Sequence, residues 1–306
     1  MFISINGQLG SGKSVVCDFL QKKYSFEVFS TGKIQREFAI SRGLSTLELN
    51  EVAKSDSTFD NYIDKALTDY AKANVGRKVV FDSRLAWHFI PDSFKVHLLI
   101  NPSIAAKRVF SNRRTKEETY ENEKDAMNSL IERRNLEQNR YRLLYGINMN
   151  DLRNYDLVLD TTSLSIPEMC KIVIEEYEKY VCGERTSTLI VSPKNIYPTE
   201  GIRNINMERV LEYKANPQML ESVPITLAQI EDVLFVMDGH HRIMAANLLE
   251  KSTLRAYLKY STGDTFPSGV SAEQYVTVSL SDVYDWEDAN RLRFGYYPSC
   301  IKSRKY

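Results

Sequence analysis

Residues 2–14 read FISINGQLGSGKS, and this stretch decides the fold of the first half of the chain. An apolar run typical of a buried strand is followed by the spacing G-x-x-x-x-G-K-S, which begins at Gly7 and ends at Ser14. Glycines let backbone N–H groups turn inward around a polyphosphate, and the next helix points its positive end at the same anion. The stretch therefore predicts a phosphate-binding loop between a strand and an amphipathic helix. The alternative is a glycine-rich turn without a ligand.

The residue types in this loop also predict roles. Lys13 is expected to reach the β- and γ-phosphates of a bound nucleotide, and the hydroxyl of Ser14 is expected to ligate Mg²⁺. The residues predicted to bind the nucleotide are Gly7, Gly10, Ser11, Gly12, Lys13 and Ser14.

Composition narrows the class of protein. The chain has 306 residues, 43% of them hydrophobic, which is enough for two cores. Its 40 basic and 40 acidic residues balance, so no overall field favours nucleic acid or a membrane as partner. No apolar run approaches 18 residues, so we expect a cytoplasmic enzyme. The four cysteines are far apart, which favours free thiols over a metal or redox motif.

The first 180 residues alternate strands with helices, which predicts a parallel sheet covered by helices. A helix-rich insertion at 31–72 suits an acceptor-binding arm. A second helical stretch, 116–145, is rich in Arg and Glu and poor in apolar residues, so we expect it to lie over the site as a lid. The expected strands are residues 2–5, 27–29, 78–82, 96–100 and 156–159.

A short polar segment at 181–187 contains Gly183 and marks a domain boundary, which predicts domains at 1–182 and 188–306. After it, the sequence DGHHRIMAANLLE predicts a loop that leads into a helix. The periodicity of the last 45 residues is too weak to assign. The other elements expected in the second domain are strands at 189–192, near 225, at 233–237 and at 254–260, and a helix at 207–214.

Seven segments of the first domain occur in the order of a known family pattern. They are GQLGSGKS, STGKIQREFA, SRGLSTLELN, DSTFDNYIDKAL, VVFDSRLA, RRNLEQNRYRLLYGI and YDLVLDTT. Over residues 1–180 the chain thereby resembles the archaeal-type branch of the cytidylate kinases. The resemblance implies a nucleoside-monophosphate kinase fold, ATP and Mg²⁺ on the donor side, and a pyrimidine nucleoside monophosphate as acceptor.

Four arginines have expected roles toward the acceptor's phosphate and the transferred phosphoryl group. Arg36 and Arg84 match positions that hold the acceptor's phosphate through bidentate contacts. Arg133 and Arg140 lie seven residues apart on one helical face, from which they would close on the transferred phosphoryl group. The alternative for each lid arginine is a solvated ion pair with a neighbouring Glu. Either Arg113 or Arg114 is a further candidate.

Acidic residues have expected roles beside them. Asp82 ends a buried strand, where it would organise Mg²⁺ through water or contact the acceptor. Asp60 and Asp64 match acidic family positions that would read the acceptor's base or ribose, although an ordinary helix face explains them slightly better. At position 33 this chain has a lysine where many members of the family have an acidic residue. The sequence therefore predicts the identity of the acceptor less firmly than the kinase activity.

A second resemblance covers about residues 188–260. The segments LIVSPKNIYPTE, PITLAQ, VLFVMDGHHRIMAANLLE and LRAYLKY resemble the ParB/sulfiredoxin superfamily, and within it the free serine kinases. The resemblance implies that Glu200 is a base toward a hydroxyl group and that Asp238 contacts the substrate. The alternative for Glu200 is an ordinary loop carboxylate without a catalytic role. The alternative for the two histidines is that one caps the helix and the other packs in the core. The residues implied to bind nucleotide phosphates are Gly239, His240, His241 and Arg242, with His241 also in a catalytic role.

The predicted fold class is α/β, a P-loop kinase parallel sheet with a helical acceptor arm and lid, followed by a smaller α+β ParB/sulfiredoxin-like domain. The predicted function is an ATP-dependent phosphotransferase whose first domain phosphorylates CMP or a related phosphorylated small molecule. The second domain would be a second nucleotide-dependent site, with a small hydroxyl compound such as free serine as acceptor. The alternatives are a non-catalytic nucleotide-sensing or partner-binding second domain, and a kinase that modifies nucleic acid.

Overall fold

The structure, a computed structural model, describes residues 1–44, 48, 58–111, 120–184, 187–202 and 205–301. The chain divides into two compact units. The first unit comprises Met1–Leu98, Arg134–Leu157 and Ile166–Thr186, and the second comprises Leu99–Arg133, Val158–Ser165 and Ser187–Tyr306. The compact units thus interleave along the chain, and the domain limits 1–182 and 188–306 stay a prediction.

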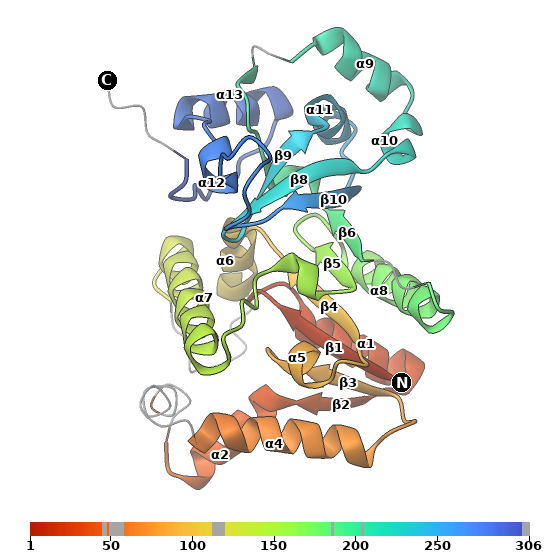
Figure 1. Ribbon diagram of the computed structural model, residues 1–306, viewed down its shortest axis with the longest axis vertical. Helices are drawn as coiled ribbons and strands as arrows, with labels where there is room; N and C mark the ends of the chain where they lie inside the picture. The colour runs from red at the N-terminus through yellow and green to blue at the C-terminus, as the bar shows by residue number, and fades with distance from the viewer. Residues whose placement is uncertain (45–47, 49–57, 112–119, 185–186, 203–204, 302–306) are drawn as a thin grey trace. The chain divides into compact units, whose positions relative to one another are not determined.

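The first unit is built on a parallel sheet with the strand order β2-β3-β1-β4 (Figure 1). The P-loop follows the inner strand β1, so it lies at the carboxyl edge of the sheet. The expected strands are confirmed to within two residues at each end. The strands are β1 (Phe2–Gly7), β2 (Glu27–Ser30), β3 (Val79–Asp82), β4 (Phe94–Leu99) and β5 (Leu157–Asp160), the last of which crosses the division between the units.

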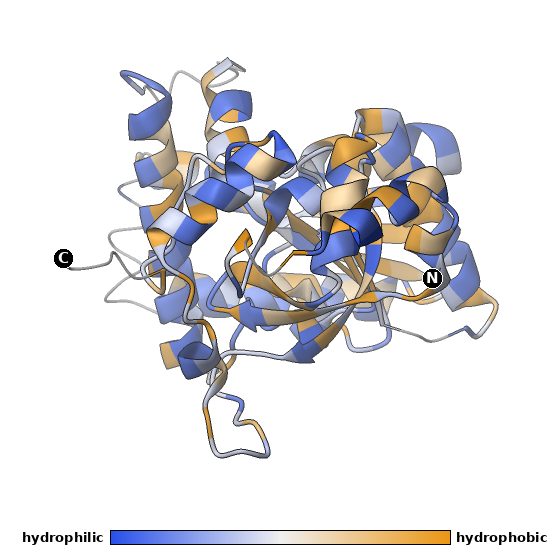
Figure 2. Ribbon diagram, turned by 90° about the horizontal axis from the view of Figure 1, so that it is seen from above, coloured by the Kyte–Doolittle hydropathy of each residue, from blue (hydrophilic) through white to orange (hydrophobic). Residues whose placement is uncertain are grey.

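Apolar side chains explain why these strands are central. Ile3, Ile5, Val79, Val80 and Phe81 are fully buried. Strands that are covered on both faces are apolar throughout, as parallel strands under helices usually are. In Figure 2 the helices carry hydrophilic and hydrophobic residues side by side, as expected of helices with one face against a sheet.

Helices cover the sheet of the first unit. Helix α1 (Lys13–Tyr24) packs against α8 (Ile166–Val181). In the insertion, α4 (Thr58–Ala73) packs through Leu67 and Ala71 against β3 and α5 (Ala86–Phe89). Helix α2 (Thr31–Ser41) packs on α4 through Ala39 and Phe59. The helical character of the insertion is thereby confirmed at α2 and α4, while residues 45–47 and 49–57 lie outside the described ones. Its role as an acceptor-binding arm stays a prediction.

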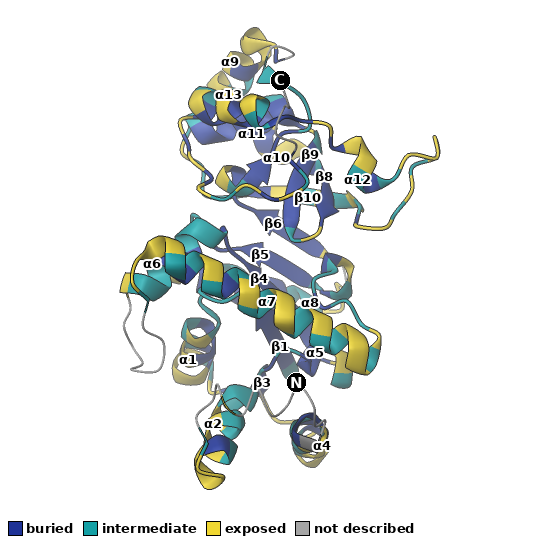
Figure 3. Cartoon of the chain, turned by 90° about the vertical axis from the view of Figure 1, so that its left-hand side faces the viewer, coloured by how far each residue is buried: buried dark blue, intermediate teal, exposed yellow. Residues whose placement is uncertain are grey.

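Helix α7 (Glu123–Tyr145) occupies the stretch expected to be a lid. Its buried residues are Ala126 and Leu130, and Figure 3 shows exposed and half-buried residues along the rest of it. A helix with so little apolar surface cannot form part of a core. Arg113 and Arg114 lie outside the described residues. Helix α6 (Pro102–Ser111) precedes this gap.

The second unit contains a mixed sheet with the order β6-β10-β8-β9-β7. Strand β10 is antiparallel to β6 and parallel to β8, while β9 is antiparallel to β8 and parallel to β7. The expected strand at 254–260 is confirmed exactly. The strands are β6 (Thr188–Val191), β7 (Ile196–Tyr197), β8 (Ile225–Ile230), β9 (Val233–Asp238) and β10 (Leu254–Tyr260). The helices include α9 (Met207–Ala215), α10 (Met219–Ser222), α11 (His240–Leu248), α12 (Ala272–Tyr275) and α13 (Leu280–Asn290). The 3-10 turns among the described residues include η1 (Leu152–Asn154) and η2 (Pro193–Asn195).

The aromatic tail, which the sequence left unassigned, belongs to the core of the second unit. Phe294 is fully buried and stacks on Tyr197 with ring centroids 4.0 Å apart. The buried carboxylate of Glu287 accepts from the N–H of Phe294 at 2.6 Å and from the hydroxyl of Tyr297 at 3.0 Å. Such contacts come from tertiary packing, which a periodicity argument does not detect.

Two expectations about the whole chain have structural counterparts. All four cysteines are free thiols, as predicted. Within the part of the chain that the structure describes, every helix is too short or too polar to cross a membrane.

Candidate active site

Close backbone approach explains two glycines of the P-loop. A Cβ on Gly7 would lie 2.8 Å from Cβ of Leu98, closer than real atoms come. Gly12 has φ 94°, in the left-handed region that favours glycine, and it starts helix α1 without a side-chain cap. A Cβ on Gly12 would lie 3.1 Å from Cε of Met169. The loop therefore packs closely on Leu98 and Met169 of the first unit and leads directly into the N-terminus of α1.

A buried hydrogen-bond chain fixes the start of the loop. The N–H of Gly7 donates to Oδ1 of Asn6 at 2.7 Å, and Nδ2 of Asn6 donates to the hydroxyl of Tyr155 at 2.8 Å. That hydroxyl donates to the carbonyl of Met149 at 2.6 Å. Burial raises the pKa of Tyr155, so the phenol stays protonated and can act as donor. Each group in the chain has a partner, which holds the loop in one arrangement.

Two cations converge on one oxygen of the loop. Nζ of Lys13 donates to the carbonyl of Gly7 at 3.3 Å, and Nη1 of Arg84 donates to the same oxygen. Burial, and then the charge of Arg84, lower the pKa of Lys13 to about 8, although Asp82 and Glu137 oppose the shift. The lowered pKa reflects burial first and the nearby positive charge of Arg84 second. An anion at this point would relieve the repulsion.

The residues predicted to hold Mg²⁺ lie at the same edge of the sheet. Asp82 ends β3 and accepts from the hydroxyl of Ser30 at 3.2 Å. Ser14 is exposed on the first turn of α1. Among the described residues, no three His, Cys, Asp or Glu side chains gather as a metal site, so a protein-only metal cage is not what this edge provides. One carboxylate and one hydroxyl suit Mg²⁺ that keeps waters and phosphate oxygens as its other ligands.

The fit to a bound polyphosphate rests on the loop itself. Gly7 has no room for a side chain, and Gly12 has a left-handed φ of 94°, as expected of a loop whose backbone N–H groups turn toward an anion. The hydroxyl of Ser11 is fully buried and, within the described residues, has no hydrogen-bond partner. A buried hydroxyl without a partner is uncommon in native proteins and often marks a ligand or water position. These features suit the phosphates of ATP.

On the acceptor side, the structure joins the two predicted carboxylates to α7. Asp60 is 8% exposed and accepts from Nε of Arg140 at 3.2 Å and from its Nη2. Asp64 accepts from the hydroxyl of Tyr145 at 2.5 Å. Burial raises the pKa of Asp64, while the bond from Tyr145 acts in the opposite direction. Arg140 was predicted to contact phosphate, so its pairing with Asp60 brings two predicted site residues together.

Other predicted residues are more exposed. Arg36 is exposed on α2, with Nη1 3.6 Å from the place of a Cβ on Gly32. Lys33 pairs with Glu37 at 3.9 Å, and both side chains are mostly in solvent. Arg133 is half-buried on α7, seven residues before Arg140. The predicted roles of these residues stay predictions.

Two residues that the sequence argument missed lie among the cations. Nε of Arg84 is 3.0 Å from Oε2 of Glu137, and both side chains are about four-fifths buried. His97 is 3% exposed on β4, with its ring 4.6 Å from that of Tyr155. Burial and the charges of Arg84 and Lys13 lower the pKa of His97 to about 3, so it is neutral. A lone histidine in the apolar run FKVHLLI was the available signal, whereas Glu137 had none beyond its place in the lid helix.

In the second unit, the structure brings Glu200 beside His240 rather than His241. Nδ1 of His240 lies 3.3 Å from Oε1 of Glu200, and Nε2 lies 3.2 Å from the hydroxyl of Thr199. His240 is 5% exposed, and burial lowers its pKa. Glu200 keeps 42% of its side chain exposed. The pair therefore leaves a carboxylate accessible above a buried imidazole.

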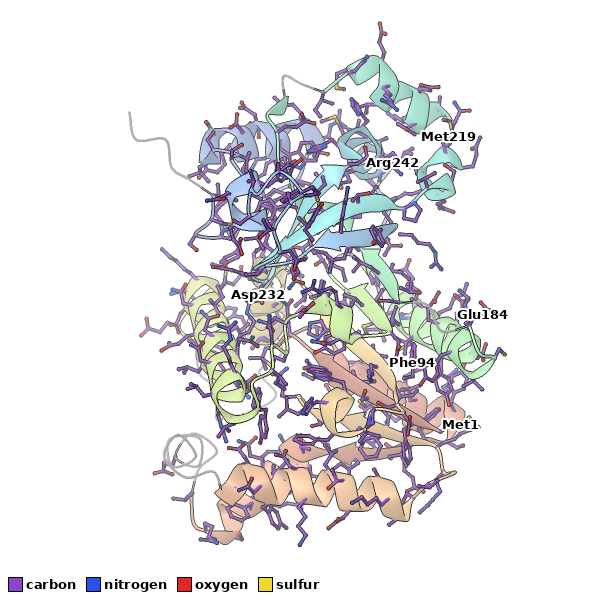
Figure 4. The ribbon with its side chains drawn as sticks, viewed as in Figure 1. Met1, Phe94, Glu184, Met219, Asp232 and Arg242 are labelled. Carbon is purple, nitrogen blue, oxygen red and sulfur yellow. The ribbon has the colours of Figure 1, made fainter. Side chains whose placement is uncertain are left out.

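The remaining residues of the DGHHR motif are engaged within the unit. Nε2 of His241 accepts from the N–H of Asn206 at 3.0 Å. Arg242, labelled in Figure 4, is 7% exposed and donates from Nη2 to Asp238 at 2.9 Å and from Nη1 to the carbonyl of Val223. Asp238 itself is largely exposed. The described contacts thus place Arg242 in a local ion pair.

Gly239 fits the position that the motif assigns to it. It has φ 111° and precedes α11, and a Cβ there would lie 2.6 Å from Cγ2 of Ile225. The glycine is required by packing and by backbone conformation alike.

The parallel sheet, the P-loop after β1 and the cations at its edge define a P-loop nucleotide kinase. Comparison with known proteins agrees with this class. The profile of the "Cytidylate kinase-like family" matches residues 2–163, which is more than half of the chain. The chain therefore belongs to the cytidylate kinase-like family. Its enzyme class is that of the nucleoside-monophosphate kinases.

Individual relatives show how far the likeness extends. The cytidylate kinase of Sulfurisphaera tokodaii is 33% identical over 184 residues, which cover 60% of this chain and 98% of the relative. An "S-adenosylmethionine-dependent nucleotide dehydratase" of Lacinutrix mariniflava is 32% identical over 178 residues. That match covers 58% of this chain but only 36% of the relative's length. The family profile ends at residue 163, and the likeness of about residues 188–260 to the ParB/sulfiredoxin superfamily stays a prediction.

Among solved structures, the shikimate kinase of Bacteroides thetaiotaomicron is similar to 58% of this chain, with 98% of that chain covered. The TM-score is 0.41 and the sequence identity 15%. No functional conclusion is attached to a likeness of this size.

Proposed function

We propose that the first unit transfers the γ-phosphoryl group of ATP to CMP or a closely related nucleoside monophosphate. The observation that carries the proposal is the pair of cations on the carbonyl of Gly7, where Lys13 and Arg84 both donate. Phosphoryl transfer demands little covalent chemistry from the protein, so positioning and charge stabilisation supply most of the acceleration.

The roles of the side chains follow from this arrangement. The bond from the γ-phosphorus to the bridging oxygen breaks, a bond to an oxygen of the acceptor's phosphate forms, and ADP leaves. Lys13 offsets the charge on the group in transfer, and Arg84 orients the acceptor's phosphate. Mg²⁺ would neutralise part of the phosphate charge, and Ser14 and Asp82 are the protein groups that would hold it. Asp60 and Asp64 are half-buried or buried acceptors of hydrogen bonds at the acceptor arm, where Arg140 and Tyr145 contact them.

The experiment is an ADP-coupled assay of the full chain with Mg²⁺-ATP and a panel of CMP, dCMP, UMP, AMP and free serine. We expect rapid ADP formation with CMP or dCMP, and loss of it in Lys13→Ala. Lys22→Ala, at the far end of the same helix, is the matched control. ADP formation at the basal hydrolysis level with every nucleotide would contradict the proposal.

A second candidate function concerns the second unit, where Glu200 is exposed beside buried His240 at 3.3 Å. In this proposal Glu200 accepts the proton of a small hydroxyl compound such as serine while a nucleotide is bound near Gly239. Arg242 is already paired with Asp238, so this site requires that pair to open toward a phosphate. Phosphoserine formation that disappears in Glu200→Gln would support it. A non-catalytic nucleotide-sensing module predicts nucleotide binding without any phosphoserine.

A further inference from the structure

The donors of Arg84 are divided between the loop and the lid helix. Nη1 donates to the carbonyl of Gly7, and Nε faces Oε2 of Glu137 at 3.0 Å. A guanidinium binds a carboxylate and a phosphate through the same paired N–H groups. A phosphate that approaches Arg84 must therefore compete with Glu137 for at least one donor.

The part of α7 that carries Glu137 is attached by polar contacts. From Arg134 to Tyr145 no residue of the helix is buried, and Leu143 is 86% exposed. Besides the Arg84 pair, the contacts of this part of the helix include Arg140 to Asp60 and Tyr145 to Asp64, with a ring contact of Tyr145 to Phe89. Little apolar packing therefore fixes Glu137, so exchange of its carboxylate for another anion disturbs no core.

The charge of Glu137 acts on the same groups that would grip a phosphate. Burial and then Arg84 lower the pKa of Lys13, and Glu137 opposes that shift; burial and then Glu137 raise the pKa of neighbouring Tyr141. An incoming phosphate thus meets a negative carboxylate among the cations that attract it. Removal of that charge should strengthen phosphate binding, whereas a group that merely orients Arg84 should have the opposite effect when removed.

We propose that Glu137 is an intramolecular competitor for the acceptor's phosphate, which holds Arg84 until a phosphate group displaces it. The inference rests on the proposed function in that the acceptor carries a phosphate. It gives Glu137 a part in specificity, because a nucleoside without phosphate cannot displace the carboxylate from Arg84.

The test is calorimetric titration of the full chain with inorganic phosphate, which requires no turnover and so remains informative if CMP is not the acceptor. We expect Glu137→Gln to bind phosphate about fivefold more tightly, the gain from a partly buried ion pair of about 1 kcal/mol. Glu132→Gln, an exposed carboxylate on the same helix, should bind as the unmodified chain does. In an Arg84→Met background the gain should vanish.

Equal or weaker binding by Glu137→Gln would overturn the proposal, as would a gain that persists without Arg84. Circular dichroism and the unfolding temperature show whether each variant is folded. If Glu137→Gln does not fold, Glu137→Asp is tested in the same way, since its shorter carboxylate keeps the charge but reaches Arg84 less well. Its expected result is also tighter phosphate binding.

Discussion

Helices α1 and α11 begin in the same way in the two units. Each follows a strand, each starts after a glycine in the left-handed region, and neither has a side-chain cap. Around α1, Lys13 and Arg84 crowd onto one carbonyl oxygen. Around α11, Arg242 is neutralised by Asp238. A glycine before a helix therefore supplies the backbone for an anion site, but we expect the balance of cations and carboxylates to decide whether phosphate is drawn to it. At α1 two cations share one loop carbonyl even though Glu137 pairs with Arg84, whereas at α11 one cation pairs with one carboxylate.

The sharpest way to break this comparison is Lys13→Ala. We expect the rate of CMP phosphorylation to fall about a hundredfold or more, because one preorganised charge next to the group in transfer is removed. The measurement is the coupled assay at saturating ATP, with Lys22→Ala as control. Retained activity would mean that the crowded cations are not the catalytic centre.

Substitution of the two glycines, Gly12 and Gly239, should lower the free energy of unfolding by different amounts. Gly239→Ala places a Cβ 2.6 Å from buried Ile225, so backbone strain and overpacking together cost about 2–4 kcal/mol. Gly12→Ala meets only the flexible end of Met169 at 3.1 Å and should cost about 1–2 kcal/mol of unfolding free energy.

Urea denaturation of both variants measures this difference. Gly263→Ala isolates the backbone strain, because that glycine has φ 88° and no atom within 4 Å of an added Cβ. A larger loss at Gly12 than at Gly239 would contradict the packing argument.

The pH dependence of catalysis tests the lowered pKa of Lys13, which burial and the charge of Arg84 cause together. The pKa of Lys13 is lowered to about 8, so the ammonium form needed for phosphate is lost as pH rises through 8. We expect kcat/KM, which reports the free enzyme, to fall about tenfold per pH unit above that value. An alkaline limb near pH 10 instead would show that burial and Arg84 do not lower the pKa of Lys13 in the free enzyme.

The smallest expected effect belongs to the second unit. Glu200→Gln should leave CMP phosphorylation unchanged within about twofold, since Glu200 contacts His240 in its own unit. Steady-state kinetics with CMP measures it. A clear loss would show that the two sites are coupled.

The sequence predicted much of the fold because its signals were local. The strand at 254–260 and the helix after Gly239 follow from apolar runs and turn residues, and both are present. The tail was not predictable, because Phe294 and Tyr297 are held by Tyr197 and Glu287 from other segments. Part of the candidate site was predictable in the same way, since motif spacing located the phosphate-binding loop. Glu137 and His97 were not predicted, because no motif marks them.

By itself, the sequence determined the phosphate-binding loop and membership of a kinase family, since both depend on residue types at fixed spacing. Tertiary structure alone decided which charges meet. Glu137 reaches Arg84 and Arg140 reaches Asp60 only because the sheet and α4 bring distant segments against α7. The physical reason is that electrostatic interaction depends on distance in space, which spacing along the chain does not fix beyond a helical turn.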